Sequence, residues 1–138
     1  MKRIFVDTGA WCAIEDKRDV HHIEALLFKE EIVGTCMLVT TDYVLDEAYT
    51  LLLLNIGYKG TVAFHNKIEQ MADAGILNIV RISQSLADET WKIFEQFNVD
   101  KEWSFTDCSS YAVMKQLEID EAFVFDHHFE QMCFVKRP

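Results

Sequence analysis

The sequence predicts an α/β fold with a mostly parallel central sheet, and three observations support this. Short apolar stretches alternate along the chain with longer segments of helical periodicity. The chain has 138 residues, half of them hydrophobic, which is enough for one continuous core. Five glycines and one proline leave little material for a linker. We therefore expect a single domain that spans residues 1–138.

Five short apolar segments are predicted to form the strands. They are Lys2–Val6, Thr35–Val39, Leu77–Ile82, Ala122–Phe125 and Cys133–Val135. In open parallel sheets, ligands bind beyond the carboxyl ends of the strands. Functional side chains are therefore expected directly after these segments.

Two helices are expected between the first two strands. Gly9–Asp16 has the length of a short helix. Asp19 is a candidate N-cap for a second helix that runs to about Glu31, with Ile23, Leu26 and Leu27 facing inward.

Four further helices are expected in the rest of the chain. Asp42–Ile56 ends at Gly57, and Lys59–Ala74 is followed by a second glycine, which commonly ends a helix. Ser85 and Asp88 have the spacing of a capping box and would open a helix to about Phe97. The last helix is predicted over 105–118.

Four carboxylates occupy positions where a charge is unfavourable unless it has a function. Asp7 and Asp126 each follow an apolar strand directly. Glu47 lies at the edge of the apolar stripe of its helix, and Asp107 lies on the inner face of its own. Gathered carboxylates repel each other and lose solvation, so they need a cation. The pattern predicts a magnesium or manganese site and favours a metal-dependent nuclease.

Each of these acids also has a simpler explanation. Glu47 can pack its stem while its carboxylate reaches water, and Asp107 can complete a capping box with Ser104. Asp7 can serve as an N-cap and Asp126 as a turn residue. The functional interpretation is favoured because four such coincidences would have to occur together.

Charge and cysteine usage limit the class of protein further. The 13 basic and 23 acidic residues give a net charge of −10, which disfavours tight electrostatic binding of nucleic acid and suits a basic protein partner.

The four cysteines form no CxxC pair, so we expect reduced, mostly buried thiols and no zinc knuckle. Leu51–Leu54 is the longest apolar run, far too short for a membrane span, and no signal-peptide core is present. The expected location is the cytoplasm.

The acids also lie in segments that resemble the ordered motifs of the PIN-domain nucleases. They occupy positions 7, 47, 107 and 126, so that gaps of 40, 60 and 19 residues separate them. The matching segments are Ile4–Trp11, Thr40–Glu47, Ser104–Ser110 and Ala122–Phe129. Together they span nearly the whole chain, whose length looks most like a VapC-type toxin of a toxin–antitoxin pair.

This resemblance implies a three-layer α/β/α sandwich and a magnesium-dependent endoribonuclease, with manganese as the alternative cofactor. It also implies RNA as substrate, a homodimer, a basic antitoxin as partner and no membrane association. The metal-binding and catalytic acids would be Asp7, Glu47, Asp107 and Asp126, with the hydroxyls of Thr8 and Thr106 beside them.

One residue departs from the family pattern, and two rival classes stay open. Many members carry a second acid two residues after the last one, where this chain has His128. We expect His128 to face solvent or the RNA backbone, and a second metal to bind weakly. The rivals are a non-catalytic PIN-like module that binds RNA or protein and, with less support, a receiver-like signalling domain.

Overall fold

Five parallel strands form the central sheet in this computed structural model, which describes residues 1–138. The strands, in chain order, are β1 (Lys2–Val6), β2 (Cys36–Thr41), β3 (Leu77–Val80), β4 (Glu121–Phe123) and β5 (Val135–Arg137). Their order across the sheet is β3–β2–β1–β4–β5, and every neighbouring pair is parallel. The predicted mostly parallel sheet is therefore confirmed, and it is wholly parallel.

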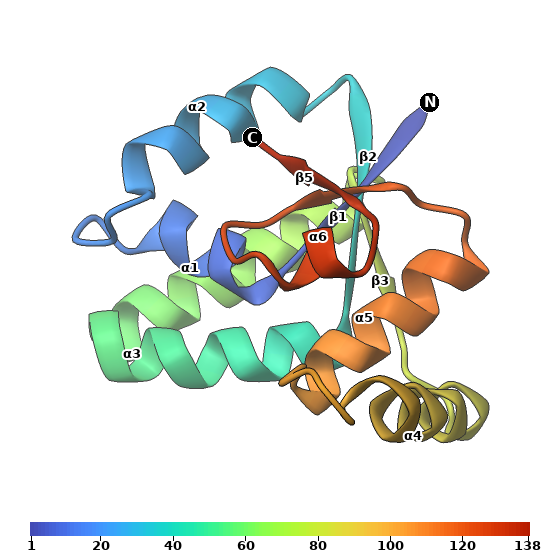
Figure 1. The fold of residues 1–138 in the computed structure, drawn as a ribbon. Helices are drawn as coiled ribbons and strands as arrows, with labels where there is room; N and C mark the ends of the chain where they lie inside the picture. Colours follow the sequence, from blue (N-terminus) through green and yellow to red (C-terminus); the bar gives the residue numbers. More distant parts are fainter.

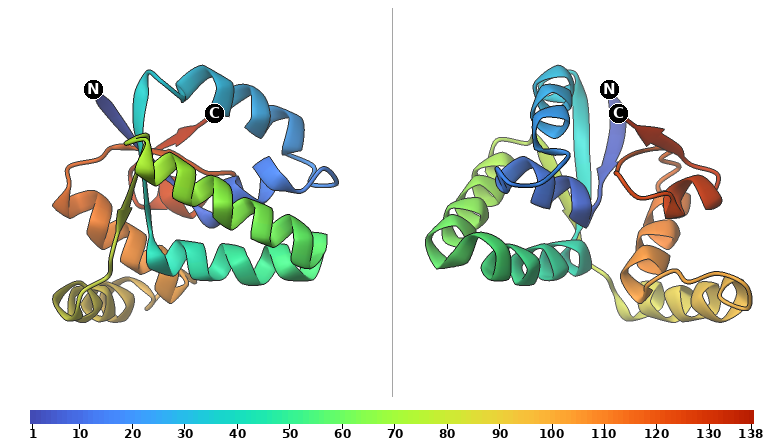
Figure 2. Two further views of the ribbon diagram at one scale, coloured as in Figure 1. Left: turned by 180° about the vertical axis from the view of Figure 1, so that it is seen from behind. Right: turned by 60° about the vertical axis from the view of Figure 1, so that its left-hand side comes forward.

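Six helices cover the sheet in two layers. They are α1 (Thr8–Glu15), α2 (His22–Ile32), α3 (Asp42–Asp73), α4 (Gln84–Phe97), α5 (Phe105–Gln116) and α6 (His128–Gln131). The first three cover one face and the last three cover the other (Figures 1 and 2). This arrangement confirms the three-layer α/β/α sandwich. None of the helices is both long and apolar enough to cross a membrane.

The central strand β1 is buried on both faces, which explains its uninterrupted apolar sequence. Ile4, Phe5 and Val6 are at most 1% exposed. Phe5 pairs with Val39 of β2 on one side and with Ala122 of β4 on the other. Strands covered by helices on both faces lack the apolar–polar alternation of half-exposed strands.

The strand order reverses at β1, and doubly wound sheets have a crevice at the carboxyl end of the strand where this occurs. β2, the next strand along the chain, pairs with one edge of β1. β4, the fourth strand along the chain, pairs with the other edge of β1. In doubly wound sheets, ligands bind where the strand order reverses in this way. Asp7 is the first residue after β1 and therefore lies at this point.

The long helix α3 is a hairpin of two helical halves, as the sequence predicts. Gly57 interrupts it with φ 86° and ψ −177°, values that favour glycine. The halves pack against each other, since the ring of Tyr49 lies 5.6 Å from that of Phe64 and its hydroxyl lies 2.8 Å from His65 Nδ1. Figure 1 shows the chain turning back at the end labelled α3.

The buried face of α2 differs from the prediction. Ile23 and Leu27 are 68% and 63% exposed, whereas Ala25, Phe28 and Ile32 are buried. The Phe28 ring packs edge-on against a phenylalanine of β4, with centroids 4.8 Å apart, and this contact fixes the rotation of the helix.

Three smaller expectations were also wrong. Ser83, not Ser85, caps α4 by accepting a hydrogen bond from Leu86 N. The short helix α6 was not predicted, because four residues carry too little periodicity to be recognised. The four cysteines are free thiols as expected, but only Cys108 is buried, so the expectation of mostly buried thiols is wrong.

Candidate metal centre

Asp7 lies at the carboxyl edge of the sheet, directly after β1. Its backbone N–H donates to the carbonyl oxygen of Phe123 at 3.2 Å, which ties the end of β1 to the end of β4. The residue is 4% exposed, and its Oδ1 is buried without a hydrogen-bond partner. Buried carboxylates are almost always paired, so this oxygen needs an explanation.

The surroundings of Asp7 disfavour its charged form. Burial raises the pKa of Asp7 well above the usual carboxyl value, and Asp107, Asp126 and Glu47 raise it further in that order. Among the ion pairs of the protein, only one involves any of these four acids, and its cationic partner is a histidine. The structure therefore brings Asp107, Asp126 and Glu47 within electrostatic reach of Asp7, and none of the four acids pairs with a lysine or arginine.

Asp107 has the capping role that its sequence allows, and its carboxylate also contacts His128. It completes a capping box, because Ser104 Oγ accepts from Asp107 N at 2.9 Å and Asp107 Oδ2 accepts from Ser104 N at 3.3 Å. The same Oδ2 lies 3.0 Å from His128 Nδ1. The cap thus fixes the carboxylate at the start of α5 and turns it toward the crevice.

Asp126 and His128 approach Asp107 from the segment that follows β4. Asp126 Oδ1 accepts a hydrogen bond from His128 N at 2.9 Å, which closes a tight turn before α6. Ligand atoms of Asp107, Asp126 and His128 lie within 4.8 Å of one another. The expectation that His128 faces solvent is wrong, since its side chain is 28% exposed and contacts Asp107. The expected contact with the RNA backbone stays a prediction.

Glu47 faces the same crevice from α3. It is half-buried, whereas its neighbour Asp46 is exposed on the other side of the helix, as the apolar stripe predicts. Thr41 begins α3 by accepting from Val44 N at 3.0 Å, and this cap sets the direction in which the helix leaves β2.

A buried hydrogen-bond chain holds the floor of the site. Trp11 Nε1 donates to Thr40 Oγ1 at 3.2 Å, and this hydroxyl donates to the carbonyl oxygen of Val6 at 3.0 Å. The chain joins α1, β2 and β1 directly behind Asp7. Thr8 Oγ1 is buried beside Asp7 and has no partner, whereas Thr106 is less buried.

These donor groups fit a divalent cation. A buried carboxylate oxygen has no partner, the neighbouring acids raise its pKa, and no lysine or arginine pairs with the cluster. Carboxylate oxygens are preferred ligands of magnesium and manganese. Sequence reasoning missed the contact of His128 with Asp107, for which the position of His128 two residues after Asp126 was only a weak signal.

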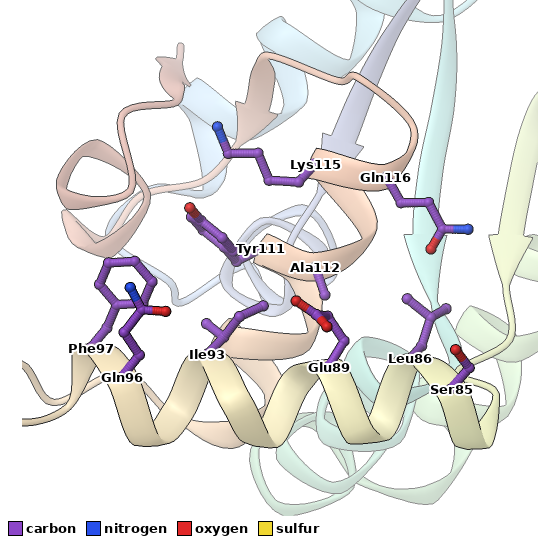
Figure 3. A pocket seen from close by; sticks show the side chains of 10 residues that line it. All are labelled: Ser85, Leu86, Glu89, Ile93, Gln96, Phe97, Tyr111, Ala112, Lys115 and Gln116. Atoms are coloured by element: carbon purple, nitrogen blue, oxygen red, sulfur yellow. The ribbon is translucent and has the colours of Figure 1, made fainter.

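A second hollow lies away from the acids, between α4 and α5 (Figure 3). Its volume is 590 Å³, and Leu86, Ile93 and Tyr111 line it together with polar side chains. Glu89 is the only carboxylate in its lining. Because this lining holds one acid and one lysine and no group of acids, the acidic crevice is the better functional candidate.

Comparison with known proteins agrees with this geometry. Residues 4–135 match the family model of the PIN domain. The 23S rRNA-specific endonuclease VapC20 of Mycobacterium tuberculosis is 29% identical over 133 residues, covering 96% of each chain, in two strains. The crystal structure of M. tuberculosis VapC20, described as a Sarcin-Ricin loop cleaving toxin, has a TM-score of 0.84 at 27% identity and 96% coverage of both chains. FitAcB from Neisseria gonorrhoeae shares the fold, with a TM-score of 0.63, 15% identity and coverage of 98% of this chain and 96% of that one. The protein belongs to the PIN domain family.

Proposed function

We propose that the protein is a metal-dependent endoribonuclease and the toxin of a toxin–antitoxin pair. The observation that carries the proposal is the unpartnered, buried Oδ1 of Asp7 among three further acids. The likeness to VapC20, an RNA endonuclease by name, supports it. Four retained acids in one crevice argue against a non-catalytic module, and PIN family membership removes the receiver-like alternative.

The four acids would bind the cation and orient the attacking water. We assign Asp7 and Asp107 as the main ligands, because both are buried and fixed by backbone hydrogen bonds. A bound magnesium or manganese ion would supply a Lewis acid that stabilises negative charge on the scissile phosphate. Asp126 would complete the ligand set, and half-buried Glu47 would orient the attacking water and accept its proton.

The test of this proposal is cleavage of RNA by the purified chain after removal of metal and its controlled return. Magnesium or manganese should restore cleavage, and EDTA should stop it. Glu47→Gln should lower the rate by about a hundredfold or more, the range for a positioned general base. Asp46→Asn is the matched control, because the neighbouring acid points away from the crevice and should leave the rate unchanged. Equal rates for the two variants would contradict the role of Glu47.

The RNA strand would pass through a polar hollow next to His128. This hollow has a volume of 520 Å³, and its lining includes Asn98, Lys101, His127 and Gln131. The chain carries a net charge of −10, so each cation near the crevice matters for phosphate binding. Lys101 is the only lysine or arginine in this lining, which also holds Asp100 and Glu102, and its Nζ lies 3.2 Å from Asp100 Oδ2.

Lys101→Ala should therefore weaken RNA binding at low salt and flatten its salt dependence. Loss of one phosphate contact reduces the slope of log K against log salt by about one unit. The measurement is fluorescence anisotropy of a labelled RNA with the inactive Asp7→Asn protein at several salt concentrations. Lys59→Ala, on the distant turn of α3, is the control. An unchanged slope for Lys101→Ala would remove this residue from the RNA path.

We propose that the protein is a homodimer held by an aromatic surface beside the crevice. The rings of Tyr43, Phe105, Phe94 and Trp91 follow one another with centroids 6.3, 6.2 and 5.4 Å apart. Trp91 is 53% exposed and Phe105 is 37% exposed. Exposed aromatic groups of this kind usually mark an interface.

Trp91→Glu should convert the dimer to a monomer, because burying an unpaired charge in an apolar interface is unfavourable. Light scattering after size exclusion measures this directly. Leu54→Glu is the control, since Leu54 is exposed at the far turn of α3 and should leave the dimer intact. A monomeric wild-type protein, or a dimer that survives Trp91→Glu, would contradict the assignment.

The proposed antitoxin is a basic protein that covers the acidic crevice. Exposed apolar side chains on α2 and near Gly57, including Ile23, Leu27 and Leu54, would pack against it. A lysine or arginine of the partner would then reach the four acids, which lack a cation of their own. We further propose that residues 1–138 act as one domain and that the protein works in the cytoplasm, where its four free thiols stay reduced.

A further inference from the structure

Three potential donor groups meet at one point of the crevice, and one of them is an imidazole. His128 Nδ1 and carboxylate oxygens of Asp107 and Asp126 lie within 4.8 Å of one another. The shortest of these contacts, from His128 Nδ1 to Asp107 Oδ2, is 3.0 Å. Adjacent ligands of an octahedral ion with bonds of about 2.1 Å lie about 3.0 Å apart. The imidazole and the carboxylate therefore have the spacing of two neighbouring ligands.

The imidazole is held in this place by two independent features. The backbone N–H of His128 donates to Asp126 Oδ1 at 2.9 Å, which fixes the turn. The next residue, Phe129, is fully buried and packs edge-on against Phe5 and Phe134, with centroids 6.3 and 6.4 Å away. A ligand that is held by its own packing loses little freedom when a metal binds.

The neighbouring carboxylates show that the crevice is prepared for a cation. Asp7 Oδ1 is buried without a partner, and its residue is only 4% exposed. Of the four acids, only Asp107 forms an ion pair, and its partner is His128 itself. The imidazole is thus the only nitrogen side chain within ion-pair distance of the cluster.

We propose that His128 is a ligand of the metal centre through Nδ1, and that this nitrogen makes the centre prefer Mn²⁺ over Mg²⁺. Magnesium is a hard cation that takes oxygen ligands, whereas imidazole suits first-row transition metals. A site with carboxylates and one imidazole therefore prefers Mn²⁺ over Mg²⁺ more strongly than a site with carboxylates alone. The inference rests on the proposed function, because it adds a residue to that same centre.

The competing role for His128 is to donate a hydrogen bond to Asp107 and so position it. The variant His128→Asn separates the two roles. Its side-chain amide can stand where Nδ1 stands and donate to Asp107 Oδ2, but it has no ring nitrogen to offer a metal. A positioning role survives this change, whereas ligation by the imidazole does not. His128→Asp tests the same point with a fifth carboxylate in place of the ring.

The experiment measures metal binding to the RNA-free protein. Pulsed electron paramagnetic resonance of the Mn²⁺-loaded wild type should show coupling to a directly bound ¹⁴N nucleus. The coupling should vanish in His128→Asn and persist in His127→Asn, the matched control. Calorimetric titration should show that the ratio of the Mg²⁺ to the Mn²⁺ dissociation constant falls by about tenfold or more in His128→Asp and His128→Asn.

Several results would overturn the assignment. They are absence of Mn²⁺ binding, absence of ¹⁴N coupling in the wild type, and a coupling or metal preference that is unchanged in His128→Asn. Cleavage assays on the same samples separate this inference from the proposed function. Nitrogen coupling without RNA cleavage would support His128 as a metal ligand and contradict the proposed nuclease activity. Cleavage with Mn²⁺ but without nitrogen coupling would support the nuclease activity and contradict His128 as a metal ligand.

Discussion

Asp7→Asn should abolish RNA cleavage and, in the absence of metal, make the protein more stable. Activity should fall by more than about a hundredfold, since even indirect supports of a metal contribute tenfold to a hundredfold. Stability should rise because the substitution removes a carboxylate that is buried among three others. Opposite effects on activity and stability are expected where a strained site is kept for function.

The raised pKa of Asp7 also predicts how stability changes with pH. Burial and the neighbouring acids raise the pKa of Asp7 in the folded protein above its value in the unfolded chain. The folded state therefore binds more protons, and stability falls as pH rises from the ordinary carboxyl range through the raised pKa. In the metal-free wild type, the contribution of Asp7 to the free energy of unfolding is fully favourable at low pH and is lost toward neutral pH.

Urea unfolding of the chelator-treated proteins at pH 5 and pH 7 measures this effect. The stability advantage of Asp7→Asn over the wild type should be larger at pH 7 than at pH 5. Asp73→Asn, an exposed acid at the end of α3, is the control for loss of one negative charge. A destabilised Asp7→Asn protein, or one that still cleaves RNA at the wild-type rate, would contradict the account of this residue.

Phe129→Ala should cause the largest loss of stability among the substitutions near the site. Phe129 is fully buried, and its ring contacts those of Phe5 and Phe134. Replacing a buried phenylalanine by alanine costs about 3–5 kcal/mol, a large part of the roughly 5–15 kcal/mol that stabilises a typical domain. Since Phe129 anchors α6, the variant should also lose metal affinity by releasing His128 and Asp126.

Denaturant unfolding at one fixed protein concentration checks this value, because the proposed dimer would make the midpoint depend on concentration. The midpoint should fall while the slope of the transition stays constant. Tyr58→Ala, which removes a 75% exposed aromatic ring at the turn of α3, should change stability by less than about 0.5 kcal/mol. A loss below about 1 kcal/mol for Phe129→Ala would show that α6 is not anchored by this ring.

The position of the acids was predictable because strand ends converge in a parallel sheet. Asp7 and Asp126 follow β1 and β4, which are neighbours, so strand identification alone brought them together. Glu47 and Asp107 were predictable from helical periodicity and from the capping box at Ser104. These features depend on local sequence, which explains why they could be read from one chain.

The features that were missed depend on contacts between distant segments. The rotation of α2 is set by Phe28 against Phe123, and nothing in the periodicity of α2 indicates this partner. The position of His128 depends on a turn after β4 that brings it to Asp107, which precedes it by 21 residues. Neither the turn nor the contact has a strong local signal in the sequence.

The most direct test of the central claim follows metal occupancy and cleavage in the same samples. Metal-free protein is titrated with Mn²⁺ or Mg²⁺, and both the thermal midpoint and the rate of RNA cleavage are recorded at each concentration. The account predicts that the two rise together in the wild type and that neither rises in Asp107→Asn. Cleavage that persists in EDTA, or that is undiminished in Asp107→Asn, would contradict the claim that these carboxylates hold the catalytic metal.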